Sequence, residues 1–185
     1  TVSFLAKARK ENKKILFEGA QGSMLDIDFG TYPYVTSSNC TSGGALTGSG
    51  IGIGYIEGIV AIIKAYTTRV GEGPFVTELF DEISTTIREK AHEYGVVTHR
   101  PRRIGWLDLV QLRFSQNVNG FKHGALMLFD ILSGLGDIKV CTAYELDGKI
   151  IDYVPASLKE TYRCKPIYKT FKGWNEDISK CKTYD

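Results

Sequence analysis

The sequence lacks the features that mark membrane, secreted and metal-binding proteins. Its 185 residues include no apolar stretch of about 18 residues, so we expect no transmembrane helix and no membrane partner. The first residues, TVSFLAKARKENKK, have no apolar core of the kind found in signal peptides. The four cysteines form no CxxC pair, and the three histidines show no metal-ligand spacing. We therefore expect a cytoplasmic protein with free thiols and no metal ligands in this chain.

The chain also has little net charge, since 23 Lys and Arg residues face 21 Asp and Glu residues. A net charge of +2 does not favour a nucleic-acid partner through bulk electrostatics. With 43% hydrophobic and 24% charged residues, the composition is that of a chain that buries a core. The length fits one α/β segment spanning residues 1–185.

Hydrophobic patterns predict strands that alternate with helices. Strands are expected at residues 15–17, 125–132 and 138–146, and the continuous apolar run at 125–132 indicates a fully buried strand. Helices are expected at residues 3–12, 55–63, 81–94 and 106–119. This alternation implies an α/β fold with a central, mostly parallel sheet and flanking helices.

Glycines mark the expected turns. Asp147-Gly148 lies between two apolar runs and predicts a hairpin, with residues 149–154 as the returning strand. Gly95 and Gly120 are expected to end the helices that precede them.

Residues 14–54 hold nine of the 20 glycines, together with many Ser and Thr residues. One interpretation is a flexible linker. The other is a folded loop whose backbone N–H groups surround an anionic ligand. Apolar side chains such as Leu25 and Phe29 favour the folded loop, because a solvated linker has no need of them. Within this loop, we expect Asp26 and Asp28 to act as acceptors that fix the backbone rather than as catalysts.

Three arginines, Arg100, Arg102 and Arg103, lie within four residues. Guanidinium groups bind carboxylates and phosphates through two hydrogen bonds. Three of them on one loop repel each other unless an anion neutralises them, which suggests an anion site. A solvated basic turn is the other interpretation, and the residues alone leave the two even. Farther along, Asp130 interrupts an apolar run, and such an acid must be paired if it is buried.

Four segments, in order, resemble the adenylosuccinate synthetase family: FEGAQGSMLDIDFGTYPYVTSSN, KAYTTRVGEGPFVTEL, RPRRIGWLDLVQLR and KVCTAYELDG. The resemblance implies a P-loop-NTPase-like α/β fold. It also implies a ligase of AMP biosynthesis that joins IMP and L-aspartate, with GTP hydrolysis, to give adenylosuccinate. GTP is then a substrate, Mg²⁺ a cofactor, and a homodimer the expected assembly.

The same resemblance assigns binding residues position by position. For IMP these are Gln21, Thr36, Val70, Gly71 and Arg100. For L-aspartate they are Val96, Val97, Thr98, His99, Arg100, Pro101 and Arg102. For GTP they are Arg102 and Asp130. Arg103 belongs to the motif but receives no ligand contact.

The chain departs from the family pattern in several places. Leu128 replaces the lysine of a Lys-Leu-Asp motif, and His99 replaces a glycine. The Gly-Asp-Glu-Gly-Lys-Gly phosphate loop and the catalytic acid/base pair of the family have no match here. We therefore expect a central portion of the family's chain, with no catalytic residue and no Mg²⁺ ligand of its own, that is inactive alone. The alternative to the ligase is a catalytically inactive nucleotide- or anion-binding fragment.

Overall fold

The structure, a computed structural model, describes residues 1–96 and 99–183. Two residues predicted to bind aspartate, Val97 and Thr98, lie outside this described part. The chain divides into two compact units, which we describe separately. Unit 1 contains Thr1–Ala61 and Ser115–His123, and unit 2 contains Ile62–Phe114 and Gly124–Asp185.

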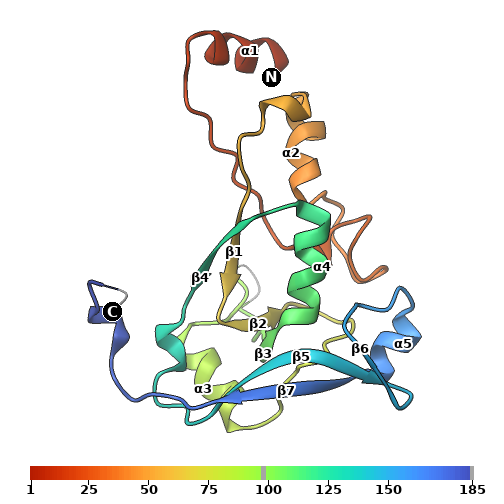
Figure 1. Cartoon of the computed structure of the whole chain (residues 1–185), viewed down its shortest axis with the longest axis vertical. Helices are drawn as coiled ribbons and strands as arrows, with labels where there is room; N and C mark the ends of the chain where they lie inside the picture. The colour runs from red at the N-terminus through yellow and green to blue at the C-terminus, as the bar shows by residue number, and fades with distance from the viewer. Residues whose placement is uncertain (97–98, 184–185) are drawn as a thin grey trace. The chain divides into compact units, whose positions relative to one another are not determined.

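Unit 1 consists of short helices and an ordered loop (Figure 1). Its helices are α1 (Val2–Lys10), η1 (Ser23–Leu25), α2 (Ser42–Ser49) and η2 (Ile53–Tyr55). Helix α1 confirms the helix predicted at residues 3–12. Helix α2 ends at Gly50, which has a positive φ of 74° and donates its N–H to the Leu46 carbonyl.

Two predictions at the borders of this unit are wrong. Residues 15–17 form no strand, and Leu16 is 91% exposed. No described strand runs beside them, so their backbone groups have no ladder to join. The helix predicted at residues 55–63 is also absent, because strand β1 (Val60–Lys64) occupies its second half. The β-branched side chains of this run suit a strand better than a helix.

Unit 2 contains a five-stranded sheet in the order β2-β3-β5-β6, with β7 paired to β5. Its strands are β2 (Tyr66–Arg69), β3 (Arg103–Asp108), β5 (Ile138–Leu146), β6 (Lys149–Ile151) and β7 (Lys165–Phe171). Figure 1 shows β5 and β7 side by side along the sheet. Strand β1 pairs separately with β4 (His123–Met127).

These strands and helices confirm the α/β class. The sheet itself is mixed, since β3 and β5 are parallel while β2–β3, β5–β6 and β5–β7 are antiparallel. The predominance of parallel pairs that we expected is therefore not seen in this sheet. Strand β5 has the predicted bounds, and the predicted hairpin to β6 is confirmed. Asp147 and Gly148 both have positive φ, as a tight two-residue hairpin turn requires.

The helices of this part of the chain are α3 (Glu82–Lys90), α4 (Leu109–Asn119), α5 (Leu158–Arg163), η3 (Asp130–Leu132) and η4 (Ile178–Lys180). Helix α3 begins after Asp81, whose carboxylate accepts the Ser84 N–H, and ends well before Gly95. Gly95 is therefore not its cap. Gly120 ends α4 as predicted, with a positive φ and its N–H bonded to the Gln116 carbonyl.

Helix α4 begins later than the predicted residue 106, because β3 continues to Asp108. The Asp108 Oδ1 atom accepts the N–H groups of Val110 and Gln111 at 3.0 and 3.1 Å, which caps the helix. Its Oδ2 atom accepts the Tyr144 hydroxyl at 2.5 Å. Burial raises the pKa of Asp108 in spite of these hydrogen bonds.

The fully buried strand predicted at residues 125–132 is wrong in extent and in burial. Strand β4 stops at Met127, which is 48% exposed. Leu128 follows with a φ of 60°, in the left-handed region that bulky residues avoid, and this turns the chain into η3. Within residues 125–132, only Leu132 is buried.

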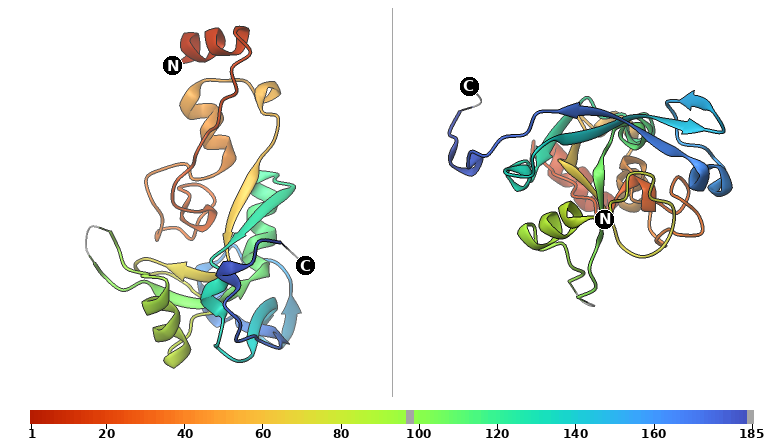
Figure 2. Two further views of the ribbon diagram at one scale, coloured as in Figure 1. Left: turned by 90° about the vertical axis from the view of Figure 1, so that its left-hand side faces the viewer. Right: turned by 90° about the horizontal axis from the view of Figure 1, so that it is seen from below.

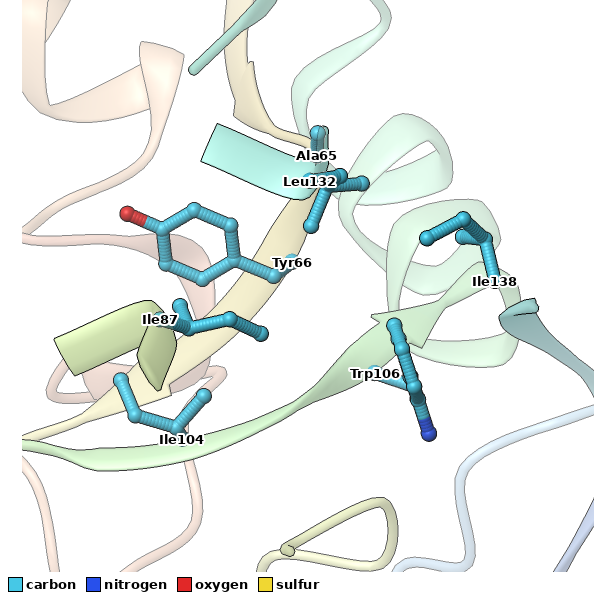
Figure 3. Packing of buried hydrophobic residues seen from close by; sticks show 7 residues of the cluster. All are labelled: Ala65, Tyr66, Ile87, Ile104, Trp106, Leu132 and Ile138. Atoms are coloured by element: carbon cyan, nitrogen blue, oxygen red, sulfur yellow. The ribbon is translucent and has the colours of Figure 1, made fainter. Parts of the chain in front are cut away.

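The main core of unit 2 lies between α3 and the sheet. Both views in Figure 2 show α3 beside β2 and β3. The buried cluster consists of Ala65, Tyr66, Ile87, Ile104, Trp106, Leu132 and Ile138 (Figure 3). In Figure 3 the Tyr66 hydroxyl points away from Trp106 and Ile138. This hydroxyl donates to Glu93, which adjoins the candidate site.

Among the described residues, no helix has the length and apolar character that crossing a membrane requires.

Candidate functional site

The glycine-rich loop of unit 1 is folded around one carboxylate. Asp26 is fully buried, and its Oδ1 atom accepts the N–H groups of Asp28 and Phe29 at 2.9 and 3.0 Å. Its Oδ2 atom accepts those of Cys40 and Thr41 at 2.6 and 3.3 Å. Four backbone donors from two segments thus meet at one side chain. A folded loop is therefore confirmed over a flexible linker, and Asp26 is confirmed as a backbone acceptor, while the binding of an anionic ligand by this loop stays a prediction.

Charge at Asp26 is stabilised by these bonds. Burial alone would raise the pKa of Asp26, but the N–H groups of the loop outweigh burial and lower the pKa below its usual value. The aspartate is therefore ionised at neutral pH and holds the loop closed. Asp28, by contrast, is exposed, and the one described side chain that donates to it is the Asn39 amide, at 3.0 Å.

The two residues of this loop predicted to bind IMP lie close together. The Oε1 atom of Gln21 is 3.5 Å from the Cys40 Sγ atom, and the Thr36 Oγ1 atom is 3.4 Å from the same sulfur. Thr36 also donates to the Leu25 carbonyl at 3.0 Å. Gln21 is exposed and has a φ of 61°, a strained backbone conformation of the kind that collects at functional sites. No pattern in the sequence selects Cys40, whose sulfur lies near both side chains.

In unit 2, the arginine loop (residues 94–102) has a neck of backbone hydrogen bonds. Tyr94 and Pro101 form an isolated antiparallel bridge. The Gly95 N–H donates to the Arg100 carbonyl, and the Arg102 N–H donates to the Glu93 carbonyl, both at 2.9 Å. His99 has a φ of 50°, which explains why a glycine suits this position in the resembling family.

The three arginines have different surroundings. Arg102 donates through Nη1 to the Glu93 Oε2 atom at 2.5 Å, and Arg103 forms a two-point pair with Glu78. Only Arg100 is exposed and, within the described part of the chain, has no side-chain partner. The argument that all three repel each other until a ligand neutralises them is therefore wrong, because two have protein carboxylates. These ion pairs could not be predicted from the sequence, because no local pattern links Glu78 to Arg103.

Arg103 has a second function in the fold. Its Nη1 atom donates to the carbonyl oxygens of Gly71 and Gly73 at 3.1 and 2.9 Å. This anchors the turn that follows β2, where Val70 and Gly71 are both exposed. Gly71 has a φ of 75°, in the region that favours glycine.

Asp130 is exposed, contrary to its predicted place inside a buried strand. It is the first residue of η3 and, together with residues 126–129, Ile178 and Ser179, lines an open groove. Phe129 stacks on Trp174 in this region, with ring centroids 4.7 Å apart. The charge of Asp130 contributes to the raised pKa of Tyr66, for which burial is the main cause and the Glu93 hydrogen bond the second.

No cluster of three or more His, Cys, Asp or Glu side chains suited to a metal ion occurs within residues 1–96 and 99–183. Mg²⁺ usually binds one or two carboxylates together with substrate phosphates and waters, so we assign no metal ligand from this finding.

Taken together, the fold and its loops define an α/β protein with an exposed guanidinium group, that of Arg100, suited to an anionic ligand. The sequence profile of the adenylosuccinate synthetase family matches residues 1–185, and the chain belongs to this family. The resemblance seen in the sequence is thereby confirmed.

Named relatives agree with this assignment. The chain is 61% identical to adenylosuccinate synthetase of Lactobacillus acidophilus over 178 residues, which cover 96% of this chain and 42% of the relative. It is 56% identical to that of Limosilactobacillus reuteri over 185 residues, covering 100% and 43%. A fully ligated adenylosuccinate synthetase from Plasmodium falciparum is 43% identical, with a TM-score of 0.94 over 97% of this chain and 43% of that one. The chain thus spans about two fifths of the relatives it matches.

Proposed function

We propose that this segment works within an adenylosuccinate synthetase, a GTP-dependent carbon–nitrogen ligase of AMP biosynthesis. The observation that carries the proposal is the match along the whole chain, together with a folded glycine-rich loop and an exposed Arg100 at the positions the family uses. In the proposed reaction, GTP transfers its γ-phosphoryl group to the IMP 6-oxygen, and the aspartate amine then displaces phosphate. The products are adenylosuccinate, GDP and phosphate.

The residues of this chain would bind and orient substrates. Gln21 and Thr36 offer an amide and a hydroxyl to IMP, while the positive φ of Gly71 allows its backbone to approach the ribose. Arg100 and Arg102 would bind the carboxylates of L-aspartate, since a guanidinium matches a carboxylate with two parallel hydrogen bonds. The other described members of this set are Val96, His99 and Pro101.

GTP would contact Arg102 through its phosphates and Asp130 through its base. A carboxylate can accept from both N–H donors on the guanine edge, which selects guanine over adenine. Asp130 suits this function because it is exposed beside a groove and its carboxylate accepts no hydrogen bond from the described residues. Mg²⁺ supplies charge neutralisation to the phosphates in such reactions. Ligands for it, like the catalytic acid/base pair, are not assigned to this chain.

A homodimer in the cytoplasm completes the proposal, as the family resemblance implies. The match to named ligases along all 185 residues favours this function over an inactive binding fragment.

The test uses a chimeric enzyme: the Limosilactobacillus reuteri protein with its matching 185-residue segment replaced by this chain. With IMP, GTP, L-aspartate and Mg²⁺, we expect it to form adenylosuccinate at a rate within about tenfold of the parent enzyme, about 1.4 kcal/mol in activation free energy. A folded chimera without activity would contradict the proposal. The 185-residue chain alone is the negative control.

In the same chimera, Gln21→Ala should weaken IMP binding by about 1–3 kcal/mol, because it leaves a polar group of the ligand unpaired. Gln116→Ala is the matched control, since within residues 1–96 and 99–183 the Gln116 amide donates to the nearby Phe121 carbonyl alone. An unchanged IMP KM in Gln21→Ala would remove Gln21 from the binding site.

A further inference from the structure

A buried carboxylate stands next to the arginine loop and is not explained by the substrate contacts above. Glu93 lies between α3 and the loop, and its side chain is only 2% exposed. An isolated buried carboxylate is costly, so this one must be compensated by its neighbours. Its contacts show how.

Three donors converge on Glu93. Its Oε1 atom accepts from Lys64 Nζ at 2.5 Å and from the Tyr66 hydroxyl at 2.7 Å. Its Oε2 atom accepts from Arg102 Nη1 at 2.5 Å. Burial would raise the pKa of Glu93, but the hydrogen bonds from Lys64, Tyr66 and Arg102 outweigh it and lower the pKa. Glu93 is therefore ionised at neutral pH.

The two sides of Glu93 differ in rigidity. Tyr66 belongs to the core and is 1% exposed, so the hydroxyl that fixes Oε1 is held by packing. Oε2 faces the loop residue Arg102, whose side chain is 27% exposed. Glu93 thus connects a guanidinium on a surface loop to the core of unit 2.

Glu93 leaves Arg102 attractive to anions. Lys64 and Arg102 carry two positive charges against the single charge of Glu93, so the cluster keeps a net charge of +1 by formal count. Glu93 occupies only the Nη1 edge of Arg102. Among the described residues, Nη2 has no acceptor, and Nε is buried without one. The guanidinium therefore retains unsatisfied donors.

We propose that Glu93, held by Tyr66 and Lys64, is a positioning residue that fixes the Arg102 guanidinium for an anionic substrate group. This rests on the proposed function, in which Arg102 binds the aspartate carboxylates and the GTP phosphates. The backbone supports it, because the Glu93 carbonyl also accepts the Arg102 N–H and the Arg88 Nε atom donates to the Arg102 carbonyl at 3.0 Å.

The sign of the effect separates positioning from competition. If Glu93 only competes with substrate for Arg102, its removal lowers the KM for aspartate, because an opposing charge is lost. If it positions Arg102, removal raises that KM in spite of the gain in positive charge. A merely structural role lowers thermal stability and leaves the KM of the folded enzyme unchanged.

The experiment measures steady-state kinetics of Glu93→Gln in the chimeric enzyme. We expect the KM values for aspartate and GTP to rise about tenfold or more, which is the size of effect that losing one charged hydrogen bond produces. The KM for IMP should change less than about threefold. Glu93→Asp keeps the charge but is one methylene shorter, so its KM values for aspartate and GTP should lie between those of the parent chimera and those of Glu93→Gln. Glu82→Gln is the matched control, because Glu82 is an exposed acid of α3 whose carboxylate contacts no described residue of the arginine loop.

Two further measurements identify the route of the effect. In an Arg102→Leu background, Glu93→Gln should change the aspartate KM less than about twofold, because its action runs through Arg102. Additive effects would overturn the proposal, as would a lowered or unchanged aspartate KM in Glu93→Gln. If Glu93→Gln does not fold, Tyr66→Phe removes one bond to Oε1 while keeping the ring, and should raise the aspartate KM in the same direction.

Hydrogen exchange separates this inference from the proposed function. A peptide covering residues 94–102 should exchange faster in Glu93→Gln than in the parent chimera, whether or not the chimera turns over, because the neck at Arg102 loses its side-chain anchor. An inactive chimera with this faster exchange would refute the proposed ligase function alone. Equal exchange in both proteins would refute the positioning role.

Discussion

Arg103 and Glu78 form a two-point ion pair, with Nε 2.7 Å from Oε1 and Nη2 2.5 Å from Oε2. The pair joins β3 to a segment 25 residues earlier in the chain. Since Arg103 also donates to the carbonyl oxygens of Gly71 and Gly73, one guanidinium holds three separate backbone segments. Its hydrogen bond to Glu78 raises the pKa of Arg103, so the pair stays charged.

Glu78→Gln should lower the free energy of unfolding by about 1.5–3 kcal/mol, the range for a hydrogen bond to a charged group. Urea denaturation of the chimeric enzyme measures it. The control is the exposed pair of Arg163 and Asp147, 2.8 Å apart, where Arg163→Gln should cost less than about 1 kcal/mol. Equal losses at both pairs would show that the Glu78 pair gains nothing from its partial burial.

Arg100→Leu should raise the aspartate KM or reduce turnover strongly, with a change in stability of about 0.5 kcal/mol or less. The reason is that Arg100 is exposed and has no side-chain partner among the described residues, so its removal breaks nothing in the fold. Arg100→Lys should rescue poorly, because an ammonium cannot form the forked contact to a carboxylate. Kinetics with varied aspartate at saturating IMP and GTP decide the matter. Parent-like values in both variants would make the arginine loop a basic turn at this position.

Asp26 predicts an acid-sensitive loop. Because the pKa of Asp26 is lower in the folded protein than its usual 3.8, its ionisation stabilises the fold above about pH 3.8. That contribution is lost as the pH falls through the still lower folded-state pKa. Asp26→Asn should cost about 1–3 kcal/mol at neutral pH, since it removes one acceptor from buried N–H groups, and should weaken this acid dependence.

Urea denaturation at several pH values tests this, with Asp28→Asn as the matched control. Asp28 accepts only the Asn39 amide, so its replacement should change stability by about 0.5 kcal/mol or less. A stability difference between the parent and Asp26→Asn that stays constant down to about pH 3 would contradict the linkage.

Gly105→Ala should destabilise unit 2 by about 1–3 kcal/mol through overpacking. A Cβ atom at Gly105 would lie 2.5 Å from the Thr77 carbonyl oxygen and 2.6 Å from a Phe75 ring carbon, and the first of these is backbone that cannot rotate away. Gly58→Ala is the control, because nothing lies within 4 Å of its Cβ position. Thermal unfolding compares the two, and a Gly105→Ala melting temperature equal to that of the control would show that β3 can shift to make room.

Elements set by local chemistry could be predicted from the sequence. The β5–β6 turn follows from Asp147-Gly148, and the end of α4 from Gly120, because both need positive φ. Predictions of buried strands from apolar runs failed where burial depends on another element that covers the run. Residues 15–17 and 125–132 look like buried strands, but an apolar run becomes one only when other elements cover it.

The candidate site shows the same division. Asp26 could be interpreted correctly as a loop-fixing acceptor, since its partners lie nearby in the chain or in the same loop. Glu78 and Glu93 could not be recognised as partners of the arginines, because only tertiary folding brings them together. Charge counting along the loop therefore overestimated the need for a ligand.

Arg102 and Arg103 are neighbours in the chain, but Arg102 binds Glu93, which follows α3, and Arg103 binds Glu78, which precedes it. Arg103 sits opposite Arg69 in the sheet. Successive side chains of an extended chain point to opposite faces, so residue count, and not side-chain type, decides which arginine meets which acid. One residue inserted between Pro101 and Ile104 would send a guanidinium to the wrong face. Insertions near Val96, beyond the Tyr94–Pro101 bridge, leave that count intact. The pairing of Arg102 and Arg103 with their acids therefore tolerates an insertion near Val96 but not one between Pro101 and Ile104.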